Sequence, residues 1–418
     1  MDKFLLLFIK LKDRGFFHLI VSNYSVQFIV FGSSLLLAKI MSPTDVGIIK
    51  TIEIFANMAI VLGGGGVVFA ILKVIPEHKE SIIRRFSLVY SLKYASIFSL
   101  TVYVIFNLVA FSGFVSDDTI LVQGFQQYSF IIVPSVLMTL LIRYYQAIDM
   151  FKRISKIIFY LKFLSAGFVL WFTYFHFIKG YILSMVITSG LATGVLLVDL
   201  RKEFIGKEIA NRHIVVKNKI LNLSRTAFIA QLIDQLKLHS RFLIANYVIL
   251  DRVMFGHYAF AFILIQGINI VTSSVQQFII PKMSKASANL PRFFSKHKKF
   301  ENQFNLIVVV VFFGAQLLLP ILVGVVFGDK YNDAIILLRI MLIGWLFEAL
   351  CALKGVVFLS LGKMKYISYA SFVILLLSCP VIYYLDMYYG GIGAAFAYVF
   401  QGFISLIVLT CFTRMVSR

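Results

Sequence analysis

The sequence predicts an all-α integral membrane protein with twelve transmembrane helices in two six-helix bundles around a central cavity. Three observations predict this fold class. Hydrophobic residues make up 60% of the 418 residues and charged residues only 14%, where about a quarter is usual in soluble proteins. Apolar stretches long enough to cross a bilayer recur along the chain with short polar gaps. These gaps alternate between basic and non-basic composition.

Continuous apolar runs of this length predict helices rather than barrel strands. The predicted N-terminal bundle covers 1–200, a cytoplasmic linker covers 201–222, and the C-terminal bundle covers 223–418. An apolar run lies within 1–15 without a small-residue cleavage site, which predicts an interfacial helix rather than a signal peptide. The expected spans are 16–38, 45–72, 87–111, 120–146, 157–176, 180–199, 224–249, 253–281, 302–327, 333–360, 366–386 and 390–413.

The charge of the gaps predicts the topology. One set is basic, namely KVIPEHKESIIRR, DMFKRISK, RKEFIGKEIANRHIVVKNKI, KMSKASANLPRFFSKHKKFE and GKMK, and the alternate gaps SGFVSDDT, FGDKYND and LDMYYGG are not. Because cytoplasmic loops are enriched in Lys and Arg, the basic set and both termini are expected in the cytoplasm. The net charge of +21 then reflects topology and contact with anionic membrane lipids, not a nucleic-acid surface.

The two halves match weakly at an offset near 213 residues. Lys39-Ile40-Met41 corresponds to Arg252-Val253-Met254, and Phe151-Lys152 with Ile154-Ser155 corresponds to Met364-Lys365 with Ile367-Ser368. Gly113, Asp118 and Ile120 correspond to Gly328, Asp333 and Ile335 at 215. An even number of helices separates the copies, so the repeats are expected to be parallel, as in many transporters.

Two stretches resemble polysaccharide and O-antigen flippases of the multidrug/oligosaccharidyl-lipid/polysaccharide exporter superfamily. Leu37–Leu62, LAKIMSPTDVGIIKTIEIFANMAIVL, is similar to their first periplasmic turn and second helix. Phe327–Trp345, FGDKYNDAIILLRIMLIGW, is similar to their turn before helix ten. The resemblance covers the full chain and implies a flippase for undecaprenyl-diphosphate-linked oligosaccharide in a bacterial inner membrane. It also implies a role in polysaccharide and lipopolysaccharide biosynthesis, beside other assembly proteins.

The span 224–249 carries a polar stripe. Asp234, Lys237 and Arg241 are spaced i, i+3 and i+7, which places them on one side of a helix. A charge at the bilayer centre costs roughly 2.5–3.5 kcal/mol, so the stripe is expected to face protein or water. One interpretation is a cationic cavity that receives an anionic cargo. The other is an intramembrane ion pair that fixes helix packing, with Arg241 extending toward the interface.

The cavity interpretation adds ionisable residues of two further spans. Its substrate-binding bases are Lys50, Lys237, Arg241 and Arg339, and its counter-charges or ion-coupling carboxylates are Glu53, Asp234 and Glu348. Without a GxxxxGKS/T phosphate loop in the sequence, coupling to H⁺ or Na⁺ is the expected energy source, and no other cofactor is predicted.

Amides and glycines suggest two further roles. Asn23, Tyr24 and Gln27 are candidate sugar contacts, with interhelical hydrogen bonding as the alternative. The run Gly63, Gly64, Gly65 and Gly66 predicts a break in the second span, either as a hinge for alternating access or for close packing of a neighbouring helix.

Three function classes remain open. The first is a lipid-linked oligosaccharide flippase that works by alternating access, and the second is an ion-coupled drug or metabolite antiporter on the same scaffold. A membrane glycosyltransferase or polymerase is the third, but the exterior gaps are too short for a sizeable catalytic loop, so a non-enzyme is expected. Cys351, Cys379 and Cys411 have neither disulfide nor metal-ligand spacing and are expected to be buried.

Overall fold

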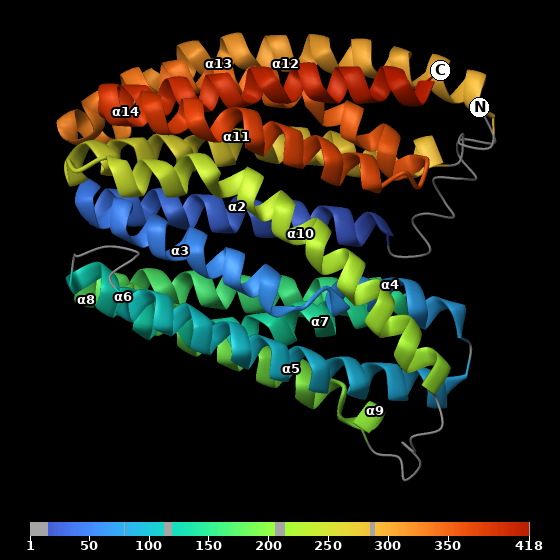
Figure 1. Cartoon of the computed structure of the whole chain (residues 1–418). Helices are drawn as coiled ribbons and strands as arrows, with labels where there is room; N and C mark the ends of the chain where they lie inside the picture. The colour runs from blue at the N-terminus through green and yellow to red at the C-terminus, as the bar shows by residue number, and fades with distance from the viewer. Residues whose placement is uncertain (1–15, 79, 113–118, 205–213, 285–288, 418) are drawn as a thin grey trace. The chain divides into compact units, whose positions relative to one another are not determined.

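The computed structural model describes residues 16–78, 80–112, 119–204, 214–284 and 289–417, and every regular element there is a helix (Figure 1). The predicted interfacial segment 1–15 and the matched pair Gly113 and Asp118 lie outside the described residues. The helices are α2 (Phe16–Ile40), α3 (Pro43–Gly63), α4 (Val67–Glu77), α5 (Ser81–Phe111), α6 (Thr119–Ser129), α7 (Ile132–Ala147), α8 (Phe151–Asp199), α9 (Arg201–Phe204), α10 (Ile214–Val248), α11 (Arg252–Ser284), α12 (Leu290–Phe327), the 3₁₀ helix η1 (Gly328–Tyr331), α13 (Asn332–Ser360) and α14 (Lys365–Ser417).

The helices identify a multi-pass membrane protein. By length and composition, six helical stretches of the described chain qualify as spans, or seven if the bent pair α6 and α7 counts as one. Three of these stretches are much longer than one bilayer crossing. A straight helix of 49 residues, the length of α8, would extend about 70 Å, more than twice the hydrocarbon thickness.

The longest helices are interrupted where the sequence predicts a turn between spans. In α8 the backbone of Phe177 has φ 50° and ψ −132°, and in α14 Gly390 has φ 55° and ψ −131°. These residues are 213 positions apart, which is the offset of the predicted repeat. Three residues later, a Cβ on Gly180 would lie 2.2 Å from the Phe172 carbonyl oxygen, and the equivalent distance at Gly393 is 1.9 Å. Both turns therefore need a glycine at the same point.

The turns before α8 and α14 repeat at the same offset. Met150 N donates to Tyr145 O at 3.0 Å, and Lys363 N donates to Phe358 O at 2.8 Å. The preceding residues, Asp149 and Gly362, have φ of 62° and 69°. The preceding helices, α7 and α13, thus end in the same Schellman motif. This geometry supports the predicted match between 151–155 and 364–368.

The match of Lys39-Ile40-Met41 with Arg252-Val253-Met254 is wrong in register. The first triplet ends α2, whereas the second begins α11. The caps correspond at an offset of 209 instead: Ser42 Oγ accepts from Asp45 N, and Asp251 Oδ1 accepts from Met254 N. The similarity of three residues was too short to predict the correct alignment of the two turns.

Contacts divide the chain into two compact units. Unit 1 comprises Met1–Ser33 and Ile52–Leu232, and unit 2 comprises Ser34–Thr51 and Ile233–Arg418. Their boundaries fall inside α2, α3 and α10, not in a linker. The domain boundaries 1–200 and 223–418 remain a prediction, and part of the expected linker 201–222 is helical in α9 and α10.

Each unit has one central helix. In unit 1, α7 packs against α4, α5 and α8, and apolar side chains such as Ile71, Leu140 and Leu196 are fully buried there. In unit 2, α13 packs against α11, α12 and α14. Leu338, Met341 and Trp345 of α13 have no exposed surface.

Several predicted element boundaries are corrected by the structure. The predicted span 45–72 is broken between α3 and α4, and the predicted span 120–146 is divided between α6 and α7. Most of the basic gap around 282–301 is helical, because α12 begins at Leu290, where the Asn289 side chain accepts from Arg292 N. The lysine-rich residues before 302 therefore form the first turns of α12, and the apolar span 302–327 follows them in the same helix. The charged residues did not mark the start of this helix.

Candidate functional site

The predicted stripe of α10 forms a polar cluster within unit 2. Lys237 Nζ lies 3.2 Å from Asp234 Oδ1, one helical turn away, as the spacing predicts. Asp234 also accepts a hydrogen bond from Ser371 Oγ of α14 at 3.2 Å. The Lys237 and Asp234 side chains are 26% and 48% exposed. This end of the stripe is therefore accessible, and its ion pair is weak.

Arg241 is the buried end of the stripe. Its side chain is 3% exposed, and Nη1 donates to Glu348 Oε1 of α13 at 2.6 Å. Tyr398 Oη of α14 donates to the other carboxylate oxygen at 2.7 Å. The guanidinium carbon lies 3.7 Å from the centre of the Tyr398 ring, a cation–π distance. Arg241 is thus held by one carboxylate and one aromatic ring.

The Arg241 guanidinium has one N–H donor that no described residue accepts from. Its Nε is buried and has no hydrogen-bond partner within the described residues. A guanidinium offers five N–H donors in a fixed plane, so an incoming anionic oxygen has a donor to bind.

An amide anchors α14 beneath the stripe. Gln401 Nε2 donates to Lys237 O at 3.2 Å, to Ser240 Oγ at 3.0 Å and to Ser378 Oγ at 3.2 Å. Because these partners lie on α10 and on the first arm of α14, and Gln401 itself lies on the second arm, Gln401 fixes the stripe against the hairpin. Sequence reasoning missed it, since a glutamine in an apolar helix gives no indication of its partner.

Lys50 belongs to the same unit and the same electrostatic environment. It is 8% exposed and lies in the part of α3 that packs in unit 2. Lys50, Arg241 and Asp234 all lie within electrostatic reach of His239, which is 9% exposed. The structure therefore brings Lys50, Lys237, Arg241, Asp234 and Glu348 into one region.

Arg339 is not brought into this region. It is exposed, whereas the face of α13 that carries Leu338 and Met341 is buried. Glu348 follows Arg339 by nine residues, which places it half a turn around the helix. Arg339 and Glu348 were assigned to one cavity because they lie in the same predicted span, but their spacing puts them on opposite faces of the helix.

Glu53 belongs to unit 1 and has its own partners there. Tyr181 Oη donates a short hydrogen bond to Glu53 Oε1, and the Tyr181 and Tyr128 rings stack at 6.3 Å. Both tyrosines are 3% exposed. Tyr181 therefore contributes to holding the Glu53 carboxylate in unit 1.

The candidate sugar contacts lie on α2. Tyr24 and Gln27 are half-buried, and the Asn23 side chain lies outside the described residues. Their role stays a prediction.

The glycine run both breaks the helix and permits close packing. Gly65 and Gly66 have φ of 53° and 76°, and they separate α3 from α4. A Cβ on Gly66 would lie 2.1 Å from Ser224 O of α10. The predicted break is confirmed, with the close approach as its local cause, and a hinge role stays a prediction.

Lys354 of α13 pairs with Glu301 of α12 at 2.6 Å, a contact that local spacing does not predict. One charged group and one cysteine were misjudged from the sequence. Asp386, placed in an exterior gap, is 1% exposed within α14. Cys411, expected to be buried, is exposed.

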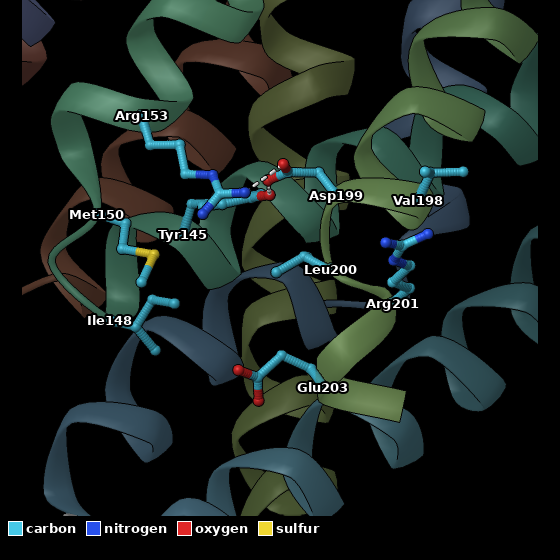
Figure 2. Close-up of a pocket in the computed structure, with 9 residues that line it drawn as sticks. All are labelled: Tyr145, Ile148, Met150, Arg153, Val198, Asp199, Leu200, Arg201 and Glu203. Atoms are coloured by element: carbon cyan, nitrogen blue, oxygen red, sulfur yellow. Dashed lines mark hydrogen bonds and ion pairs between the residues drawn. The ribbon is translucent and has the colours of Figure 1, made fainter. Parts of the chain in front are cut away.

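Unit 1 contains a separate polar cavity of about 510 Å³. Figure 2 shows the Arg153 side chain reaching Asp199 beside Tyr145, and both bond to that carboxylate. Glu203 accepts from Tyr144 at 3.2 Å. The lining holds two arginines, Arg153 and Arg201, and two carboxylates, so it has no excess positive charge.

Comparisons with known proteins concern the fold. No protein-family profile and no curated protein sequence matches this chain. The chain is similar to an inward-facing multidrug resistance MATE family transporter of the MOP superfamily, with a TM-score of 0.72, 12% identity and 94% of each chain covered. It is also similar to the lipid II flippase MurJ in an inward closed conformation, with a TM-score of 0.75, 14% identity, and 94% of this chain and 86% of MurJ covered.

The chain has the fold of MOP-superfamily transporters. A third similar structure is a MOP superfamily transporter from Pyrococcus furiosus, with a TM-score of 0.62, 14% identity, and 97% of this chain and 94% of that chain covered. These neighbours are transporters and flippases, not enzymes. The MOP-superfamily fold serves both drug transporters and a lipid-linked substrate, so the substrate must be argued from the site.

Proposed function

We propose that the protein is a flippase that moves undecaprenyl-diphosphate-linked oligosaccharide, an O-antigen or related repeat unit, from the cytoplasmic to the periplasmic leaflet. It acts in a bacterial inner membrane with both termini in the cytoplasm and works by alternating access. The observation that carries the proposal is the basic cluster of unit 2. There Lys50, Lys237 and Arg241 lie in one region, and the carboxylates of Asp234 and Glu348 pair with Lys237 and Arg241.

The charges of this cluster fit an anionic head group. A diphosphate cannot enter hydrocarbon bare, because removing its water is costly unless fixed cations and donors replace that water. The buried Nε of Arg241 offers an unused donor, and the partly exposed Lys237 can leave its weak pair with Asp234. Binding would then exchange one carboxylate partner for a phosphate oxygen.

The remaining parts of the cargo need less from the protein. The isoprenoid tail can stay in lipid while the head group crosses. Tyr24, Gln27 and Asn23 are proposed sugar contacts, and Gly63–Gly66 is the proposed hinge. Arg339 is proposed to contact the head group only in another state of the cycle, because here it is exposed and apart from Glu348.

The proposal is tested by neutralising the cluster without leaving a buried charge alone. We expect Lys237→Gln combined with Arg241→Gln and Glu348→Gln to stop surface polysaccharide in cells that lack their own copy of the protein. The lipid-linked repeat unit should accumulate, because the phosphates lose two of their three proposed cations, Lys237 and Arg241. The measurements are polysaccharide blotting, extraction of lipid-linked sugars, and membrane abundance of the variant.

A matched control neutralises a charge pair elsewhere in unit 2. Lys354→Gln combined with Glu301→Gln removes an ion pair of the same kind, 2.6 Å long, between α13 and α12. This control should keep normal polymer. Normal polymer in the triple variant at equal abundance would rule out the cationic site.

A drug or metabolite antiporter is the second candidate, because a multidrug transporter shares the fold across 94% of both chains. An antiporter for cations is expected to have an acidic site, unlike the basic cluster of unit 2. Efflux of ethidium by the purified protein in liposomes, lost in the triple variant, would favour this candidate.

A further inference from the structure

Asp386 is a buried acid without a partner. It lies in α14 four residues before the turn at Gly390, and its side chain is 1% exposed. Within the described residues, neither of its carboxyl oxygens has a hydrogen-bond partner. Both features distinguish it from Asp234 and Glu348, which have named donors.

The surroundings of Asp386 include a tyrosine whose hydroxyl has no hydrogen-bond partner among the described residues. Tyr258 of α11 is fully buried, its hydroxyl has no partner in the described chain, and it lies within electrostatic reach of Asp386. Arg241 and Glu348 also act on Tyr258, but they are paired with each other. On α11, the neighbouring His257 lies 3.7 Å from Asp333. The tyrosines nearest to Asp386 on its own helix, Tyr383, Tyr384, Tyr388 and Tyr389, are exposed.

The internal repeat shows that the hairpin does not require an acid here. Thr173 precedes Asp386 by 213 residues and lies four residues before the equivalent turn at Phe177. Thr173 is also fully buried, and its hydroxyl also lacks a partner in the described chain. The same place in the fold therefore accepts a small neutral group. The carboxyl of Asp386 needs another explanation than packing.

Burial determines whether the Asp386 side chain is a carboxylic acid or a carboxylate. An unpaired carboxylate in an apolar interior costs far more than a neutral carboxylic acid, so the site accepts the acid with its proton. In a conformation where water reaches the Asp386 carboxyl, the carboxylate is hydrated and the neutral acid is no longer favoured. A proton then moves from hydronium to the carboxylate oxygen in one state and returns to water in the other.

We propose that Asp386 is the proton-binding group through which a proton gradient drives the conformational cycle of this protein. The proposal rests on the proposed transport function for its purpose, but proton binding itself can be measured without any cargo. It names H⁺ rather than Na⁺, because the described residues contain no group of three or more His, Cys, Asp or Glu side chains that could hold a metal ion.

Proton binding is tested on the full chain in liposomes by infrared difference spectroscopy between acidic and alkaline pH. We expect a carboxylic-acid carbonyl band that disappears as pH rises, is absent in Asp386→Asn and Asp386→Thr, and persists when Arg241→Gln is combined with Glu348→Gln. Asp386→Thr copies the residue of the other repeat, so it should fold. A difference spectrum identical in wild type and both variants would overturn the proposal.

Dicyclohexylcarbodiimide provides a second, independent measurement, because it adds to protonated carboxyls in apolar surroundings. Mass spectrometry should find the adduct on the peptide that contains Asp386 at acidic pH, with less adduct as pH rises. Modification that does not change with pH would also contradict the proposal. Thr173→Val serves as a control for disturbance of the equivalent hairpin.

Coupling is tested in cells. Asp386→Asn and Asp386→Thr should lose surface polymer at normal membrane abundance, whereas Asp386→Glu should retain it. Normal polymer in both neutral variants would overturn proton coupling through Asp386 and leave the flippase proposal intact. Conversely, a titrating Asp386 together with normal polymer in the triple cluster variant would refute the flippase proposal alone.

Discussion

Arg241 and Glu348 illustrate how a charge is accommodated inside this chain. Removing both charges from a buried pair is often tolerated, whereas removing one leaves the other without compensation. The Tyr398 hydroxyl adds a charge-assisted hydrogen bond to the same carboxylate. The pair is therefore expected to respond very differently to single and double substitution.

At the residue scale, Glu348→Gln should lower the free energy of unfolding by about 3–5 kcal/mol, because Arg241 stays charged and buried. Arg241→Gln combined with Glu348→Gln should lower it much less. Thermal unfolding of the purified protein in detergent measures both. Equal losses in the single and double variants would mean that the pair contributes no specific compensation.

At the scale of the element, the break between α3 and α4 depends on glycine for two reasons. Gly66 has a left-handed backbone, and its missing side chain allows the backbone of α10 to approach at Ser224. The adjacent Gly65 also has a positive φ, of 53°, but a Cβ there would meet the rings of Tyr94 and Phe98 and not backbone atoms. A left-handed backbone and a close contact with another backbone therefore coincide at Gly66.

We expect Gly66→Ala to destabilise the protein by at least about 1–2 kcal/mol, the cost of a left-handed alanine, with a further loss from overlap with Ser224 O. Gly167→Ala in α8 is the matched control, because no atom lies within 4 Å of its added Cβ. That variant should be neutral or gain up to about 1 kcal/mol. Unfolding midpoints of the two variants provide the comparison, and a stable Gly66→Ala would show that α10 can move away.

At the scale of the whole molecule, the turns of the hairpins recur 213 residues apart with the same backbone angles. Side chains at equivalent places differ, as Thr173 and Asp386 do. Among the described residues, the buried charged side chains Lys50, Arg241 and Asp386 all belong to unit 2. If successive turns lie on opposite sides of the membrane, equivalent turns of the two repeats lie on the same side.

The topology predicts which turns face the cytoplasm. In a chain with Cys351, Cys379 and Cys411 replaced by Ala, Lys363→Cys should be protected from an impermeant maleimide added to intact cells. Asn332→Cys should react, because its turn is expected on the periplasmic side. Both positions are exposed, and each should give the opposite result in inside-out vesicles. Labelling of both from one side would contradict the predicted topology.

Local sequence alone determined the membrane spans, one ion pair and the helix breaks of this protein. Apolar runs long enough to cross a bilayer define the spans, because backbone groups in lipid must bond within their own helix. The contact between Lys237 and Asp234 follows from the helix period alone. The breaks near Phe177, Gly390 and the glycine run also follow from local sequence, since turn conformations depend on nearby residues.

Only the tertiary structure decided which distant groups meet. Arg241 and Glu348 are 107 residues apart, so no local spacing relates the two side chains. The isolation of Asp386 was equally hidden, because burial without a partner depends on every helix packed around it. Charges in a low-dielectric interior interact with whatever the fold brings near them, and sequence distance does not enter that energy.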